Sequence, residues 1–175
     1  MKSVICVNGS PRSGKDTAVS FMSETLSNMG VPTMAFSSID PVKAMLRDFV
    51  NLKRKTEADR KLLSVVGDAM QEHSGFRTGY SLFQIKEFFS DKANGVFFLH
   101  MREPKLINLM KINCEAEGIR FIRVLLESIR AENVTSNPSD AGVANGMYDA
   151  RMENNGSLDE LREECLGFLV NRVLL

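Results

Sequence analysis

The chain has 175 residues, a length that fits one domain able to bury its own hydrophobic core. Apolar residues make up 43% of the sequence and charged residues 25%, which excludes an intrinsically disordered chain. The 22 basic and 22 acidic side chains cancel. This balance disfavours nucleic acids and anionic membrane surfaces as partners, because proteins that bind them normally carry a basic excess.

The three cysteines, Cys6, Cys114 and Cys165, are far apart, and none belongs to a CxxC pair. This pattern disfavours a zinc site and is typical of free, buried thiols in a reducing compartment. The apolar stretch at the N-terminus is too short for a signal peptide, and no run reaches the length of a membrane span. We therefore expect a cytoplasmic protein.

Strand and helix patterns alternate at the start of the chain. Residues 3–7 form a short apolar run rich in β-branched side chains, which predicts a buried strand of a parallel sheet. Apolar residues then recur at helical spacing from about residue 14 to residue 29, and Gly30 is a helix stop. Residues 33–36 predict a second short strand.

Helix signals without strands follow. Asp40 as an N-cap and Pro41 at the first helical position predict a helix that runs to about residue 50. Thr56 and Asp59 form a variant capping box, which opens a helix that runs to about residue 73.

Residues 74–80 contain two glycines and predict a loop, and residues 81–89 are apolar at helical spacing. No strand pattern occurs between residues 37 and 92. We therefore expect residues 37–92 to be a helical insertion into an α/β core, placed to bind an acceptor.

The second half returns to alternation. Residues 96–101 predict the strongest interior strand, Pro104 starts a helix that ends at Gly118, and residues 119–126 predict another strand. Residues 127–146 have little pattern and predict a long, lid-like loop, since loops of this length are usually functional.

The last elements are a short strand at residues 147–153 and a helix opened by the capping box of Ser157 and Glu160. Strands that alternate with helices predict an α/β fold with a parallel sheet of about five strands flanked by helices. We expect residues 1–175 to form a single domain.

The pattern G-x-x-x-x-G-K runs from Gly9 to Lys15, after a predicted strand and before a predicted helix. Its glycines allow the backbone to wrap around phosphates, and the helix start directs N–H groups and a positive dipole at them. Lys15 adds a charge for the β- and γ-phosphates. A turn with a solvated lysine is the alternative. The residues expected to bind ATP are Gly9, Ser10, Arg12, Ser13, Gly14, Lys15, Asp16 and Thr17.

Asp16 occupies the position where the usual motif has the Ser or Thr that binds magnesium. An acid at a helix start is favourable by itself. Asp16 is therefore a partner of the helix dipole, a ligand of Mg²⁺ or a group that positions substrate. We take it as the candidate metal ligand and expect the Thr17 hydroxyl to bind a phosphate.

The loop at residues 9–17 resembles that of the phage-type deoxynucleoside monophosphate kinases. Further segments resemble that family in order and spacing: Ser38-Ile-Asp-Pro-Val-Lys43, Arg60-Lys-Leu-Leu-Ser-Val-Val-Gly67, His100-Met-Arg-Glu-Pro104, Asn137-Pro-Ser-Asp140 and residues 149–161. The resemblance implies a three-layer P-loop kinase fold, with ATP and Mg²⁺ as cofactors. It implies a nucleoside monophosphate or similar acceptor, although animal-type phosphomevalonate kinases share the loop form.

The chain departs from the family pattern at His100, where the family has an Asp. In P-loop enzymes an acid at that strand end commonly holds the water shell of magnesium, and a neutral histidine is a poor substitute. Asp16 and Glu103 are left open as replacements for this acid. The family's arginine after the fourth strand is replaced by Leu126, with Arg130 close to it.

Phosphoryl transfer needs positive charge placed around the moving group. We expect Lys15, Arg12 and Arg102 to be catalytic, with a salt bridge at a strand end as the alternative for Arg102. For the remaining candidates a solvated or structural position is the alternative. The residues expected to bind the acceptor or belong to the lid are Asp40, Lys43, Arg47, Arg77, Arg130 and Asp140.

The first expectation is ATP-dependent phosphoryl transfer to a (deoxy)nucleoside monophosphate or similar small phosphorylated acceptor. The substitution at His100 leaves open an ATP-binding regulatory protein that transfers no phosphate. An NTPase linked to nucleic acid is disfavoured by the neutral charge and small size. The expected partners are small-molecule nucleotides, and a homodimer is left open.

Overall fold

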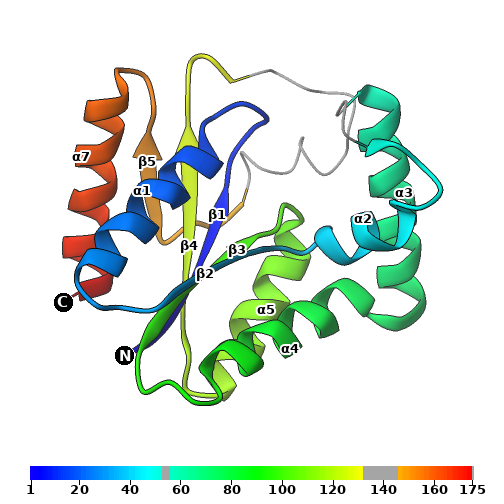
Figure 1. Ribbon diagram of the computed structural model, residues 1–175, viewed down its shortest axis with the longest axis horizontal. Coiled ribbons are helices and arrows are strands. Elements are labelled where there is room, and N and C mark those ends of the chain that lie inside the picture. Colours follow the sequence, from blue (N-terminus) through cyan, green and yellow to red (C-terminus); the bar gives the residue numbers. More distant parts are fainter. Residues whose placement is uncertain (53–55, 132–145, 175) are drawn as a thin grey trace.

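A parallel sheet forms the centre of the computed structural model, which describes residues 1–52, 56–131 and 146–174 (Figure 1). The strands are β1 (Lys2–Asn8), β2 (Thr33–Ser37), β3 (Gly95–His100), β4 (Arg120–Glu127) and β5 (Ala150–Glu153). They lie in the order β2-β3-β1-β4-β5, and every pair is parallel. The predicted sheet of about five parallel strands is confirmed.

Helices cover both faces of this sheet, which gives the three layers expected. They are α1 (Lys15–Asn28), α2 (Asp40–Leu46), α3 (Glu57–Ser74), α4 (Phe76–Phe89), α5 (Pro104–Ala116) and α7 (Leu158–Leu169), and a π-helical turn (Val170–Leu174) follows α7. The helices α1 and α7 pack together on one face, and α4 and α5 on the other. Figure 1 shows α2 and α3 at the right, away from α1 and α7. None of the helices in the described ranges is long and apolar enough to cross a membrane.

The central strand β1 is buried on both faces. Because side chains alternate along a strand, Ile5 and Val7 pack with α1 and α7, whereas Val4 and Cys6 pack with α4 and α5. Burial on both faces explains why this strand is one uninterrupted apolar run in the sequence. It also places whatever follows Asn8 at the carboxyl edge of the sheet.

The prediction of a loop at residues 74–80 is wrong, because α4 already begins at Phe76. Gly75 has a left-handed conformation, with φ 64°. It is both the C-cap of α3 and the N-cap of α4. One such residue reverses the chain direction without a loop. Gly79 lies inside α4, where its N–H donates to the carbonyl oxygen of Gly75 at 2.9 Å.

The boundaries of two further elements also differ from prediction. The helix α2 ends at Leu46 and not near residue 50, and its N-cap is Ile39. The carboxylate of Asp40 instead accepts a hydrogen bond from the Ser37 N–H at 3.1 Å, so it fixes the turn that leaves β2. The last strand begins only at Ala150.

The predicted capping box of α7 is present, and its contribution to stability can be tested. The Ser157 hydroxyl accepts from the Glu160 N–H at 3.2 Å, and the Glu160 carboxylate accepts from the Ser157 N–H at 2.6 Å. We expect Ser157→Ala to lower the free energy of unfolding by about 1 kcal/mol, because the helix loses its cap. Urea denaturation measures this. Ser157→Asn retains an acceptor and should stay near wild type; equal losses in both variants would contradict the capping role.

Candidate functional site

The segment between β1 and α1 lies at the carboxyl edge of the sheet, between two chain paths that diverge. From β1 the chain enters α1 on one face, whereas from the neighbouring strand β3 it enters α5 on the other. Open α/β sheets bind ligands where the connections of adjacent strands separate in this way. Residues 9–14 border that point. They contain most of the motif predicted to bind phosphates and are called the phosphate loop below.

The backbone of this loop is tightly curled. Positive φ angles occur at Gly9 (151°), Arg12 (62°) and Gly14 (92°). Arg12 is the only non-glycine residue with a positive φ in the part of the chain that the structure describes. A left-handed conformation costs such a residue about 1–3 kcal/mol, and residues held in this way cluster at functional sites.

Neighbouring segments leave no room for a side chain at either glycine of the loop. A Cβ on Gly9 would collide with the carbonyl oxygen of Leu126 at the end of β4. A Cβ on Gly14 would collide with the side-chain nitrogen of Asn154, which donates to the carbonyl oxygen of Ser13 at 3.0 Å. The loop is therefore held against the end of β4 and the segment that follows β5.

The ammonium group of Lys15 lies inside the curl. Its Nζ donates to the carbonyl oxygens of Gly9 at 2.7 Å and Ser10 at 2.8 Å, and it lies 3.5 Å from the Ser13 hydroxyl. The N-cap of α1 is Gly14, which has no side chain to satisfy the first N–H groups of the helix. By contrast, α3 and α7 each carry a full capping box. An uncapped helix start beside a lysine is a site suited to an anion.

Asp16 and Thr17 lie in the first turn of α1, where Asp16 is exposed and Thr17 is half-buried. Over the described ranges, no group of three or more His, Cys, Asp or Glu side chains could hold a metal ion. Magnesium bound through phosphates keeps several waters and needs only one or two carboxylates. Asp16 therefore fits a metal whose other ligands are phosphate oxygens and water.

His100 ends β3 on the same side of the sheet as α1. Val96 and Phe98 pack in the core cluster that contains α1, and His100 is the next residue in that alternation. Its carbonyl oxygen accepts from the Ser38 N–H at 3.0 Å, which joins it to the turn after β2. The imidazole therefore lies between the phosphate loop and the beginning of α2.

The pKa of His100 is lowered, and the largest cause is burial of the ring. Four charges act on it as well: Asp16 and Asp40 oppose the shift, and Lys15 and Lys43 add to it. Because the unperturbed pKa is already below 7, the imidazole is neutral at pH 7. Two of these charges belong to the first turn of α1 and two belong to α2, so both helices lie within electrostatic reach of the ring.

Two candidate acceptor residues, Lys43 of α2 and Arg47 directly after it, border a surface hollow. Lys43 pairs with Asp40 at 2.8 Å, and Arg47 lies 3.5 Å from Asp48. The hollow has a volume of about 560 Å³ and is lined by Lys43, Arg47 and residues 48–52. Both cations thus border one space, and their contact with an acceptor stays a prediction.

Arg77 is buried inside α4, with 4% of its surface exposed. Its guanidinium donates to Asp68 of α3 at 3.1 Å, to Glu103 at 2.9 Å and to the Ser38 hydroxyl at 3.2 Å. The helix α3 comes close at Gly67, where a Cβ would lie 3.4 Å from the Cδ of Arg77. Arg77 therefore joins α3 and α4 to the turns after β2 and β3, and its contact with an acceptor stays a prediction.

Arg102 and Arg130 lie in segments that border the phosphate loop. The carbonyl oxygen of Arg102 accepts from the side chain of Asn8 at 3.2 Å. Arg130 donates to the carbonyl oxygens of the 155–156 turn, at 3.3 Å and 2.8 Å. Asp140 lies outside the described residues. Ligand contacts by these three residues stay predictions.

Three residues that the sequence did not single out connect the site: Asn8, Tyr148 and Asn154. The two asparagines look like turn residues, because each stands next to a glycine-containing segment. Apart from the contact of Asn8 with Gly9, the partners of these side chains lie more than 90 residues away in the sequence, and no local pattern reveals such contacts. The one sequence signal that could have pointed to Asn8 as a site residue is its position directly before the first glycine of the loop.

Comparison with known proteins establishes the fold. No protein-family model matches the chain, and no curated protein matches its sequence. The APS kinase CysC of Mycobacterium tuberculosis, in complex with AMPPNP and APS, is similar with a TM-score of 0.55 and 15% identity, over 97% of this chain and 98% of that chain. Shikimate kinase of Aquifex aeolicus gives a TM-score of 0.50 and 18% identity, over 98% of each chain.

A sugar kinase of Janibacter sp. is also similar, with a TM-score of 0.51 and 12% identity, over 97% of this chain and 95% of that chain. The likeness extends over nearly the full length of all three structures. At these identities it shows that the chain shares its fold with these three proteins. The substrate has to be inferred from the residues of this chain.

Gly14→Ala tests the space inside the loop. We expect it to weaken ATP binding by at least about tenfold, because the new Cβ would displace Asn154 and open the curl. Titration with a fluorescent ATP analogue measures this. Gly30→Ala is the matched control, since Gly30 also has a positive φ (72°) but nothing lies near its Cβ position. Equal nucleotide affinities in the two variants would contradict the steric account.

Arg77→Ala tests the buried ion pairs. We expect it to lower the free energy of unfolding by about 3 kcal/mol, because it leaves the carboxylate of Glu103, whose side chain is only 22% exposed, without its partner. Asp68→Asn is the comparison: that side chain is 54% exposed, so the loss should stay below about 1 kcal/mol. Similar losses in thermal or urea denaturation would show that burial is not what matters at Arg77.

Proposed function

We propose that the chain is an ATP-dependent kinase whose acceptor is a nucleoside monophosphate or a similar small phosphorylated compound. The observation that carries the proposal is the curled loop before α1, where the Lys15 ammonium and an uncapped helix start converge. This is the arrangement that cradles the phosphates of a nucleotide. The similar solved structures support it, since they are described as kinases and one contains AMPPNP, an ATP analogue.

The donor side of the site supplies charge and backbone donors. When ATP binds, Lys15 would exchange the carbonyl oxygens of Gly9 and Ser10 for the β- and γ-phosphates. Arg12 is an exposed residue of the loop, and its guanidinium would reach the transferred group. Arg102 would approach from the end of β3. Positive charge on several sides of the moving phosphoryl group is what this chemistry requires.

Mg²⁺ fits this donor side through Asp16. The exposed carboxylate in the first turn of α1 would hold the ion, and phosphate oxygens and water would complete its six ligands. The ion would neutralise charge that develops on the β- and γ-phosphates. His100 contributes no carboxylate at the end of β3, so Asp16 carries this role without the second acid that is common in P-loop enzymes.

The acceptor side is proposed from α2. Lys43 and Arg47 border one hollow, and two cations one turn apart suit the phosphate of a monophosphate acceptor. Lys43 also acts electrostatically on His100, which in turn lies near Lys15. An acceptor phosphate held near Lys43 would therefore lie on the side of residues 37–92 that faces the phosphate loop. The order of segments shared with phage-type deoxynucleoside monophosphate kinases favours a nucleoside monophosphate.

A second candidate function is an ATP-binding regulatory protein that transfers no phosphate. The observation that favours it is the neutral imidazole of His100, where a P-loop enzyme usually has a carboxylate. Both functions predict binding of ATP. Only the first predicts a phosphorylated acceptor, so product formation separates them.

We also propose a cytoplasmic location. Cys6, Cys114 and Cys165 are buried, free thiols, and burial raises the pKa of each to about 12. Such thiols are protonated and unreactive, which suits a reducing compartment.

Lys15→Ala tests the mechanism. ADP release would be followed in a coupled assay, with each ribo- and deoxynucleoside monophosphate and phosphomevalonate as acceptor. We expect wild type to be active with at least one acceptor and Lys15→Ala to be slower by at least about a hundredfold, because the charge on the transferred phosphates is lost.

The matched control is Lys86→Ala. Lys86 in the last turn of α4 forms an exposed ion pair at 2.6 Å with Glu117, the C-cap residue of α5, away from the phosphate loop. Its variant should retain wild-type activity. Full activity in Lys15→Ala would overturn the proposed mechanism. Tight ATP binding with no product from any acceptor would favour the regulatory function instead.

A further inference from the structure

Asn8 is the last residue of β1 and is 1% exposed. Its side chain makes hydrogen bonds to three separate segments. The Oδ1 atom accepts from the Gly9 N–H at 2.8 Å, and the Nδ2 atom donates to the Arg102 carbonyl oxygen at 3.2 Å and to the Tyr148 hydroxyl oxygen at 3.1 Å. One amide therefore connects the phosphate loop, the segment after β3 and the segment before β5.

The orientation of this amide is determined by its partners. A carbonyl oxygen can only accept, so the NH₂ group must face Arg102, and a backbone N–H can only donate, so the amide oxygen must face Gly9. Both hydrogens of the NH₂ group are used. An Asp or Leu at this position could not make the same contacts, although each has nearly the same shape as Asn.

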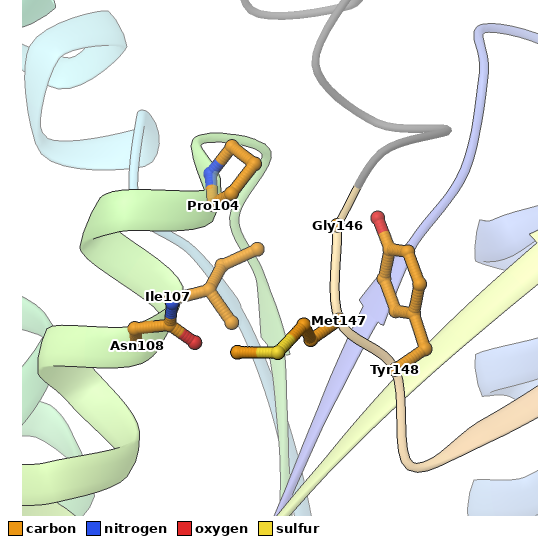
Figure 2. A pocket seen from close by; sticks show the side chains of 6 residues that line it. All are labelled: Pro104, Ile107, Asn108, Gly146, Met147 and Tyr148. Atoms are coloured by element: carbon orange, nitrogen blue, oxygen red, sulfur yellow. The ribbon is translucent and has the colours of Figure 1, made fainter.

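Tyr148 provides the third contact. Burial is the largest cause that raises its pKa, to about 12, so the phenol is neutral at pH 7 and its oxygen can accept from Asn8. Figure 2 shows its ring beside Gly146, with the hydroxyl pointing away from Met147. A Cβ on Gly146 would lie 2.8 Å from the hydroxyl oxygen, so this segment packs closely on the ring.

The segment that carries Arg102 is held from its other side as well. Glu103, the next residue, accepts hydrogen bonds from Arg77 through both carboxylate oxygens, at 3.0 Å and 2.9 Å. The peptide between Arg102 and Glu103 thus has its carbonyl oxygen bonded to Asn8, and the side chain that follows is bonded to α4. This leaves little freedom in the direction from which the Arg102 side chain departs.

We propose that Asn8 is a positioning residue for phosphoryl transfer: it holds Arg102 at a set distance from the phosphate loop, and Tyr148 keeps the amide in place. This inference rests on the proposed kinase function. Asn8 touches neither nucleotide nor acceptor. Its effect passes through Gly9 and Arg102, which belong to the two loops between which the γ-phosphate would move.

Two variants test this role by steady-state kinetics. Asn8→Ala should lower kcat on the order of a hundredfold, because a displacement of about 1 Å is enough for such a loss. Tyr148→Phe, which removes one hydrogen bond and keeps the ring, should lower kcat about fivefold. In both variants KM for ATP should change little, since the loop N–H groups and Lys15 remain. Tyr80→Phe is the control and should keep wild-type kcat, because Tyr80 is the other tyrosine of the chain, lies on α4 and stacks with Phe36 of β2.

The Arg102→Ala background supplies the decisive comparison. If Asn8 acts through Arg102, then Asn8→Ala should cause little further loss of kcat once Arg102 is absent. If the losses of kcat caused by Asn8→Ala and by Arg102→Ala multiply in the double variant, the positioning role is overturned. It is also overturned if folded Asn8→Ala and Tyr148→Phe both keep wild-type kcat. In either case the kinase proposal stands, provided that wild type transfers phosphate. A wild-type protein inactive with every acceptor would overturn both.

Discussion

The structure depends on one backbone constraint: the chain must turn from a buried central strand into a helix between Asn8 and Lys15. The turn requires left-handed conformations at Gly9, Arg12 and Gly14, and it leaves the start of α1 without a side-chain cap. Those features are unfavourable for an isolated chain. The surrounding segments hold the loop in this form, so the Lys15 ammonium and the uncapped N–H groups of α1 converge at a point suited to phosphates.

The position of His100 connects this loop to the rest of the proposed site. The residue stands at the end of β3, between the first turn of α1 and the beginning of α2, and the charges of both act on its ring. A neutral imidazole there alters the usual electrostatics of a P-loop enzyme without removing the phosphate loop. The proposed binding of ATP and the proposed transfer of its phosphate are therefore tested by separate measurements.

Much of the architecture could be predicted because its signals are local. The capping boxes at Thr56 and Ser157 and the phosphate loop each lie within a few residues of sequence. The start of α4 was missed because Gly75 was interpreted as part of a loop, although one left-handed glycine suffices to separate two helices. Arg77 and Asn8 could not be placed from sequence, because their partners are brought near only when the sheet assembles.

The central claim is that the chain binds a nucleoside triphosphate through its phosphates at the loop before α1. The most direct measurement is calorimetric titration of the wild-type protein with ATP, ADP, AMP and adenosine in the presence of Mg²⁺. The account predicts that affinity depends on the phosphates, so ATP and ADP bind far more tightly than AMP and adenosine. Equal affinity for adenosine and ATP, or no binding of ATP, would contradict it.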